Sequence, residues 1–282
     1  MAKVAIVTDT GTDLSQAQFA QYGIRRVPLE LRFGTETFLD GMLSLDEFWA
    51  RVLKGPEHPA TSQPATGLFE QVYAACIEQG YDVLCLAITS KHSGTYNSAY
   101  AAAQSFPGRV TVYDTLSLSL AQAYLAIVAS KAAAAGESVP QIVGRLNDVL
   151  KRTHMFIGLD TIEYLRRGGR ANAIMPVLER VVRVLNIKPT IDVVDGQLHF
   201  LAVDRSHDRQ VRRIRDEVAK HGPPEALACI HTRCPDEATR MAHDLGERLG
   251  FPFDQILIGE AGPVLSCHAG PGVVAAAIVT RK

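Results

Sequence analysis

Hydroxyl-bearing residues gather in three short segments of the first half of the chain. These segments are Thr8–Asp13 (TDTGTD), Thr61–Pro64 (TSQP) and Thr89–Thr95 (TSKHSGT). The last two each precede a predicted helix, and hydroxyl and N–H groups at a helix start attract anions. Ordinary helix capping explains any one of them alone. Two such helix starts in one predicted sheet, with Gly94 directly after Ser93, favour a shared anion site.

Two segments of the second half carry further candidate residues. Tyr164–Arg170 (YLRRGGR) places three arginines around a predicted Gly-Gly turn, and arginine binds carboxylate or phosphate through paired hydrogen bonds. A solvated basic turn is the simpler alternative. Gly262–Gly272 (GPVLSCHAGPG) is predicted to be a glycine-rich loop that contains His268. A lone histidine is usually structural, but the surrounding glycines allow backbone to approach a ligand closely.

Several other chemistries are excluded by missing motifs. The chain has no GxxxxGK(S/T) phosphate loop, no GxSxG nucleophile elbow and no HExxH zinc motif. Its nine histidines lack metal-ligand spacing, and its five cysteines contain no CxxC pair, so neither a metal site nor a cofactor site is predicted. Ser93 activated by His268 stays open as an alternative, and it would make the protein a serine esterase or acyl hydrolase.

Composition narrows the class of protein. The chain has 282 residues, of which 47% are hydrophobic, and a formal net charge of -1. The apolar fraction is sufficient for a packed core, and the missing basic surplus argues against nucleic-acid binding. The most apolar stretch is interrupted by Gln122, Ser130 and Lys131, which predicts a buried helix and no stable membrane insertion. The first residues do not form a signal peptide, so we expect a cytoplasmic protein.

The first half alternates apolar β-branched runs with helical patterns. This alternation predicts a parallel sheet with helices on its faces, and no antiparallel pairing is expected in this half. The predicted strands cover residues 3–8, 25–33, 82–89 and 109–115. The predicted helices begin near Ser15 and Pro64 and cover residues 45–53, 95–106, 117–135 and 139–151, with a loop at 54–60.

The second half has a different pattern. Residues 187–204 are predicted to form a hairpin that turns at Asp195-Gly196, which requires antiparallel pairing. Further strands are predicted at 154–160, 226–232, 254–260 and 273–280, and helices at 206–220 and 236–249. We therefore expect an α/β domain at 1–152 and an α+β domain with a partly antiparallel sheet at 153–282. The arginine-rich run 205–215 is predicted to be a salt-bridged helix face, with a partner-docking surface as the alternative.

Taken together, these segments resemble the DegV family of bacterial proteins, which includes the fatty-acid-binding subunit of the bacterial fatty acid kinase. The resemblance covers essentially the whole chain. Its strongest pieces occur in order at 61–64, 92–99, 161–170, 186–196 and 262–272. It implies an α/β domain with a parallel sheet followed by an α+β domain. It also implies an apolar tunnel for a long-chain fatty acid, with the carboxylate at the domain junction.

The resemblance also assigns roles to individual residues. Those that would bind the fatty acid carboxylate, or shape its pocket, are Thr61, Ser62, Ser93, Gly94 and Thr95. His268 would face the head group, and Arg170 would suit the phosphoryl group or a kinase partner. The chain departs from the family pattern at Thr10, where Ser is usual, at His92, where Leu is common, and at Ser266, where Gly is usual. The changes at His92 and Ser266 affect which ligand we expect.

The implied activity is binding rather than catalysis. A protein of this kind would present the fatty acid carboxylate to a separate fatty acid kinase, which would convert it to an acyl phosphate. We therefore expect a lipid-binding protein that is not itself an enzyme. Two alternatives stay open at this stage, the acyl hydrolase described above and a small-molecule sensor or interaction protein that uses the lipid only structurally.

Overall fold

The computed structural model describes residues 3–55, 57–170, 172, 174–182 and 187–282. The chain forms two compact units. The first contains Met1–Lys151 together with Gly262–Val264, and the second contains Arg152–Ala261 together with Leu265–Lys282. The chain therefore returns briefly to the first unit near its end.

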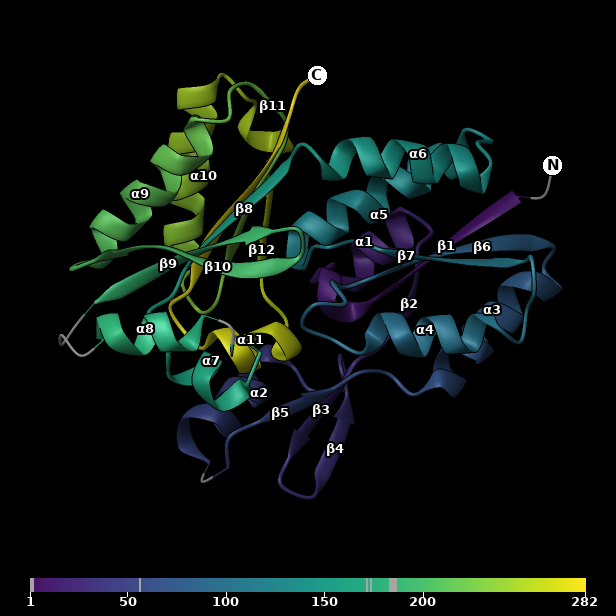
Figure 1. Ribbon diagram of the computed structural model, residues 1–282, viewed down its shortest axis with the longest axis horizontal. Coiled ribbons are helices and arrows are strands. Elements are labelled where there is room, and N and C mark those ends of the chain that lie inside the picture. Colours follow the sequence, from purple (N-terminus) through teal and green to yellow (C-terminus); the bar gives the residue numbers. More distant parts are fainter. Residues whose placement is uncertain (1–2, 56, 171, 173, 183–186) are drawn as a thin grey trace. The chain divides into compact units, whose positions relative to one another are not determined.

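A four-stranded parallel sheet forms the centre of the first unit (Figure 1). Its strands, in the order β2-β1-β6-β7, are β1 (Lys3–Asp9), β2 (Arg25–Val27), β6 (Tyr81–Ala87) and β7 (Val110–Asp114). The helices are α1 (Gln16–Gln21), α3 (Thr66–Glu78), α4 (Thr95–Ala103), α5 (Ser119–Ala134) and α6 (Val139–Leu150). Figure 1 shows α5 and α6 over one face and α3 and α4 over the other. Both faces of β1 and β6 are therefore buried, which explains their continuous apolar sequences.

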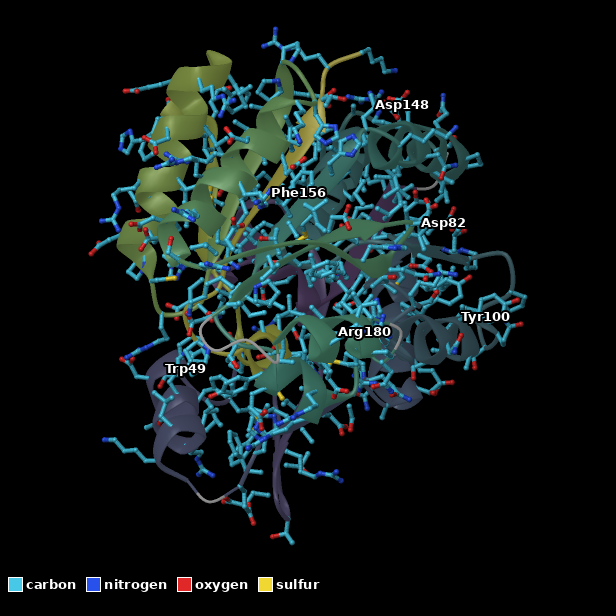
Figure 2. All side chains as sticks on the ribbon, turned by 60° about the vertical axis from the view of Figure 1, so that its left-hand side comes forward. Trp49, Asp82, Tyr100, Asp148, Phe156 and Arg180 are labelled. Carbon is cyan, nitrogen blue, oxygen red and sulfur yellow. The ribbon has the colours of Figure 1, made fainter. Side chains whose placement is uncertain are left out.

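The first unit also contains a small antiparallel sheet, so the prediction that this half lacks antiparallel pairing is wrong. Its strands, in the order β4-β3-β5, are β3 (Glu30–Phe33), β4 (Glu36–Leu39) and β5 (Ala60–Ser62). The predicted strand 25–33 is divided at Pro28, which has no N–H group to donate within a sheet. Helix α2 (Leu45–Lys54) buries Phe48 and Trp49, and Figure 2 labels Trp49.

The second unit is built on a six-stranded mixed sheet. Its strands, in the order β10-β9-β8-β13-β11-β12, are β8 (Thr153–Gly158), β9 (Lys188–Val194), β10 (Gln197–Asp204), β11 (Pro224–His231), β12 (Leu257–Glu260) and β13 (Val274–Thr280). Only the β11–β12 pair among them is parallel. The hairpin between β9 and β10 turns at Asp195 (φ 49°) and Gly196 (φ 78°), which confirms that prediction.

Helices α9 (His207–Ala219) and α10 (Pro235–Leu249) cover one face of this mixed sheet. The apolar residues between them form one cluster, which includes Val218, Met241 and Leu245. The other helices are α7 (Glu163–Gly168), α8 (Met175–Val182) and α11 (Pro263–Ala269), with single turns η1 (Thr10–Thr12) and η2 (Phe253–Gln255). None of the helices described here combines the length and apolar composition that crossing a bilayer requires.

The predicted fold class is confirmed, because a parallel α/β sheet is followed by a partly antiparallel one. Two local predictions are wrong. Helix α3 begins at Thr66 rather than at Pro64. The predicted glycine-rich loop at 262–272 begins with helix α11, since Pro263 suits a first helical position and no glycine occurs again before Gly270. Gly270 has a φ of 77°, a conformation that helices rarely continue through.

Candidate functional site

The predicted Ser-Gly-Thr segment forms the N-terminus of α4. The Oγ atom of Ser93 lies 2.8 Å from Oγ1 of Thr95 and accepts a hydrogen bond from the Thr95 N–H at 3.2 Å. Gly94 is the residue that caps the helix. Thr95 is fully buried and Ser93 is half-buried. Two hydroxyl groups therefore lie together at a helix end that carries a partial positive charge.

The Thr-Ser-Gln-Pro segment lies beside this helix start. Thr61 and Ser62 belong to β5 of the small antiparallel sheet, so they do not directly precede a helix as predicted. A Cβ atom on Gly94 would lie 2.9 Å from Cδ of Gln63. The Gln63 side chain thus occupies the space that a larger residue at position 94 would need. Two of the three predicted hydroxyl segments are therefore neighbours in the first unit.

Asp9 connects the ends of two parallel strands. Its buried carboxylate accepts hydrogen bonds from the N–H groups of Gly11 at 2.9 Å and Ile88 at 2.7 Å, and from Nε2 of Gln122 at 3.3 Å. Burial raises the pKa of Asp9 to about 6. The hydroxyl groups of this loop were predicted to matter, whereas this role of Asp9 was not predicted. The available signal was an acidic residue at the end of a continuous apolar strand.

Asp13 holds the chain segment that begins α11. Its carboxylate accepts hydrogen bonds from Oγ of Ser119 at 2.5 Å and from the N–H of Gly262 at 2.8 Å. Asp13 and Ser119 both have left-handed backbone conformations, with φ of 56° and 54°. Burial, followed by the charges of Asp40 and Asp9, raises the pKa of Asp13 to about 8. The first hydroxyl segment is therefore tied to the start of the motif that contains His268.

In the second unit, the two candidate motifs interlock. His268 lies in the last turn of α11, and its ring fills the space in front of Gly168, where a Cβ atom would collide with it. The Tyr164 ring lies in the same way against Gly270. Gly169 directly follows α7 and caps it, and its φ of 65° is the common helix-terminating conformation. In each motif, a glycine thus leaves the space in which a side chain of the other motif packs.

The three arginines of this segment have different surroundings. Arg166 and Arg167 are exposed, and both form ion pairs with Glu163 one turn earlier in α7. Arg170 is half-buried, and its positive charge acts on the Cys267 thiol, whose pKa burial raises to about 12. The charge of Arg170 therefore acts on a residue of α11.

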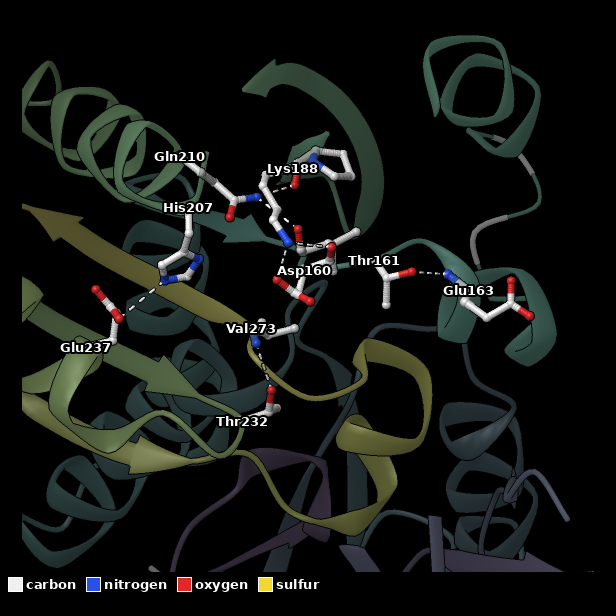
Figure 3. Close-up of polar contacts among 11 residues, drawn as sticks. Asp160, Thr161, Glu163, Lys188, His207, Gln210, Thr232, Glu237 and Val273 are labelled. Atoms are coloured by element: carbon white, nitrogen blue, oxygen red, sulfur yellow. Dashed lines mark hydrogen bonds and ion pairs between the residues drawn. The ribbon is translucent and has the colours of Figure 1, made fainter. Parts of the chain in front are cut away.

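Thr232 holds the loop that follows α11. Its Oγ1 atom donates to the Gly270 carbonyl at 2.7 Å and accepts from the Val273 N–H at 2.9 Å, the contact drawn in Figure 3. Its backbone carbonyl accepts from the Gly272 N–H at 2.8 Å. This role of Thr232 was not predicted, because a threonine at the end of a strand carries no distinguishing local signal.

Two further predictions concern the second unit. The arginine-rich run forms a salt-bridged helix face as predicted, with Arg213 bound to Asp204 at 2.7 and 2.9 Å and Arg215 paired with Asp244. In the 186–196 motif, residue 186 lies outside the described part of the chain. Among the described residues, no group of three or more histidine, cysteine or acidic side chains is arranged to hold a metal ion.

Comparison with known proteins places these motifs in one family. The family model described as "Uncharacterised protein, DegV family" matches residues 3–281. A DegV domain-containing protein of Deinococcus radiodurans is 33% identical over 98% of both chains. The solved structure entitled "Fatty Acid Binding of a DegV family Protein from Thermus thermophilus" is 28% identical, with a TM-score of 0.90 over 99% of this chain and 100% of that one.

A second solved structure, "DegV, a fatty acid binding protein from Bacillus subtilis", is 26% identical, with a TM-score of 0.86 over 100% of both chains. The likeness therefore extends across both units and all the interlocking motifs described above. A family model that accounts for nearly every residue, together with relatives of nearly equal length, leads to one conclusion: the chain belongs to the DegV family.

Proposed function

We propose that this protein binds a long-chain fatty acid and presents its carboxylate to a separate fatty acid kinase. The observation that carries the proposal is the likeness, over 99% of this chain or more, to two proteins described as fatty acid binding. In the proposed reaction the γ-phosphoryl group of ATP is transferred to a carboxylate oxygen, which yields an acyl phosphate and ADP. The sequence has no phosphate loop, so the kinase supplies the nucleotide site.

The hydroxyl groups of the first unit are proposed to bind the carboxylate. The residues are Thr61, Ser62 and Ser93, with Gly94 and Thr95 shaping the same pocket through their backbone. Supporting this, Gln63 packs on Gly94 and so makes the two segments neighbours. The hydroxyl pair of Ser93 and Thr95 at a helix N-terminus also suits an anion.

Two residues of the second unit are proposed to act on the same head group. His268 would face the carboxylate, and Arg170 would contact the phosphoryl group or the kinase. The packing of His268 against Gly168 restricts the orientation of its ring. Arg170 is half-buried and its charge acts on Cys267 of α11, whereas Arg166 and Arg167 are exposed.

The acyl tail is expected to supply most of the affinity. Each buried methylene contributes about 0.8 kcal/mol, so about 14 of them contribute on the order of 11 kcal/mol before the costs of ordering. A charge-assisted hydrogen bond contributes about 1.5–3 kcal/mol net. The hydroxyl groups would therefore orient the fatty acid and avoid an unpaired buried carboxylate.

A hydrolase is not favoured as the alternative. The Ser93 hydroxyl lies against the Thr95 hydroxyl and accepts the Thr95 N–H two residues on, which is the arrangement of a local Ser/Thr turn. The two solved structures named above are described as fatty acid binding. As part of the proposal we place the protein in the cytoplasm, where thiols stay reduced. None of its five cysteines, which all lie in the described part of the chain, forms a disulfide.

Ligand binding is tested by native mass spectrometry of the freshly purified protein, followed by titration with fatty acids of several lengths. We expect a co-purifying or added fatty acid bound at one per chain. Ser93→Ala should weaken binding about tenfold, which corresponds to one charge-assisted hydrogen bond. Ser138→Ala is the matched control, because Ser138 caps α6 away from the site. Absence of binding in the unmodified protein overturns the proposal.

Presentation to a kinase is tested separately, with ATP, a purified fatty acid kinase and hydroxylamine to trap the acyl phosphate. We expect hydroxamate to form only when this protein is present. Arg170→Ala should reduce its formation more strongly than Arg166→Ala does, because Arg166 is an exposed arginine already paired with Glu163. Fatty acid binding without any hydroxamate would leave a sensor or carrier role in place of the kinase role.

A further inference from the structure

Gln210 is a fully buried amide on α9, a helix whose other buried residues are apolar. Its Nε2 atom donates two hydrogen bonds, to the carbonyl of Pro189 at 2.7 Å and to that of Leu159 at 3.1 Å. Leu159 directly follows β8, and Pro189 is near the start of β9. A single side chain therefore joins the backbone of the two strands where β8 ends, as Figure 3 shows.

Gly158, the last residue of β8, makes room for this amide. A Cβ atom at position 158 would lie 2.8 Å from Cδ of Gln210 and 2.9 Å from Cδ1 of Ile214. The φ of Gly158 is not in the left-handed region, so its backbone does not require glycine. Position 158 therefore needs glycine because of the side chains of α9 packed above it.

The segment between β8 and the arginine motif is held by an ion pair. Asp160 directly follows Leu159, and Lys188 of β9 forms an ion pair with the Asp160 carboxylate and also donates to the Asp160 carbonyl at 3.2 Å. A Cβ atom on Gly272, in the loop after α11, would lie 3.2 Å from the Cβ atom of Asp160. Gln210 and Lys188 thus set the start of the segment that leads to Gly168, on which His268 packs.

We propose that Gln210 is a positioning residue of the head-group site, which acts by fixing the end of β8 and so the placement of Arg170 and His268. It touches neither residue and need not touch the ligand. The inference rests on the proposed function for its link to fatty acid binding. Its structural part, the control of the Glu163–Arg170 segment, is independent of that function.

The chemistry of this position favours a carboxamide. The Leu159 carbonyl needs a donor away from water, and the Pro189 carbonyl, which already accepts from the Leu159 N–H at 2.9 Å, takes its second hydrogen bond from the same amide. A buried donor with a full charge would be costly here. A neutral amide supplies two N–H groups without that charge. Glutamate, which has the same shape, presents only acceptors when ionised and would repel both carbonyls.

The first experiment compares Gln210→Met with Val218→Ala. Met has a similar shape but no donors, whereas Val218 is a buried core residue of the same helix that touches neither carbonyl. We expect both variants to be less stable. Only Gln210→Met should show at least tenfold faster amide hydrogen exchange in peptides covering Glu163–Arg170, and at least tenfold weaker fatty acid binding. Equal exchange in the two variants overturns the inference.

A second set of variants tests the same proposal in case Gln210→Met does not fold. Gly158→Ala keeps the amide but places a methyl group against it, so it should produce the same exchange and binding defects. In a Gln210→Ala background, Gly158→Ala should add little, because the space is then empty and the end of the Ile214 side chain can rotate away. Full additivity of the two substitutions would contradict the proposed steric pair.

The two claims fail in different ways. If the unmodified protein binds no fatty acid, the proposed function falls, and the exchange data on the ligand-free protein still decide the role of Gln210. If the protein binds fatty acid and Gln210→Met binds it equally well, Gln210 is not a positioning residue of that site.

Discussion

The two units hold their strand ends by opposite means. In the first unit, Asp9 accepts hydrogen bonds from the N–H groups of Gly11 and Ile88, and so joins the ends of β1 and β6. In the second unit, Gln210 donates to the carbonyls of Leu159 and Pro189, and so joins β8 to β9. Both side chains are almost completely buried. One clamp is an ionisable acceptor and the other is a neutral donor.

This difference assigns pH sensitivity to the first unit. Burial penalises the charged form of Asp9 and of Asp13, and raises the pKa of these residues to about 6 and about 8. A carboxamide does not ionise, so the Gln210 clamp holds the same hydrogen bonds across this range. Two strand ends can therefore be held together either by a side chain that titrates in this pH range or by one that does not.

The largest effect is expected from removing the acceptor in the first unit. Asp9→Ala leaves two buried N–H groups unpaired and should lower the free energy of unfolding by on the order of 3 kcal/mol. Asp9→Asn retains one acceptor and should cost roughly half as much. Urea denaturation followed by circular dichroism measures both. If Asp9→Ala proves as stable as the unmodified chain, Asp9 is not a clamp.

The next prediction concerns packing in the second unit. Gly168→Ala places a methyl group where the His268 ring lies and should cost about 1–3 kcal/mol, with weaker fatty acid binding. Gly144→Ala is the matched control, since its helix has open space there and gains from alanine about 0.5–1 kcal/mol. Thermal unfolding of both variants gives the comparison, and equal effects would contradict the close packing of Gly168.

The pH dependence tests the comparison directly. Because the folded chain keeps protons on Asp9 and Asp13 that the unfolded chain releases near pH 4, these groups lower the free energy of unfolding as pH rises from about 4 to about 8. Asp13→Asn should flatten the upper part of this slope, between pH 6 and 8. Gln210→Met should shift the whole curve without changing its slope. A slope altered equally by both variants would break the comparison.

The smallest effect is expected at the surface of the second unit. Arg215→Ala removes an ion pair with Asp244, whose side chain is 48% exposed. Such pairs contribute about 0–1 kcal/mol and are screened by salt. Denaturation at low and high salt should show a small difference that salt removes. A loss as large as that of Asp9→Ala would mean that charged side chains hold the second unit as well.

The sequence by itself determined the local features. Continuous apolar runs predicted the buried parallel strands, Ser15 marked the start of the first helix, and Asp195-Gly196 predicted the hairpin. Each of these depends on residues a few positions apart, where periodicity and backbone preference act. The family resemblance then marked the segments that interlock in each unit.

Tertiary structure decided which distant residues meet. Gly168 receives His268 and Gly158 receives Gln210, and neither pairing leaves a local pattern in the sequence. The small sheet depends likewise on β3 pairing with the distant β5. A glycine required for space looks the same in a sequence as a glycine required for a turn. The difference lies in the side chain packed above it, and only the folded chain brings that side chain there.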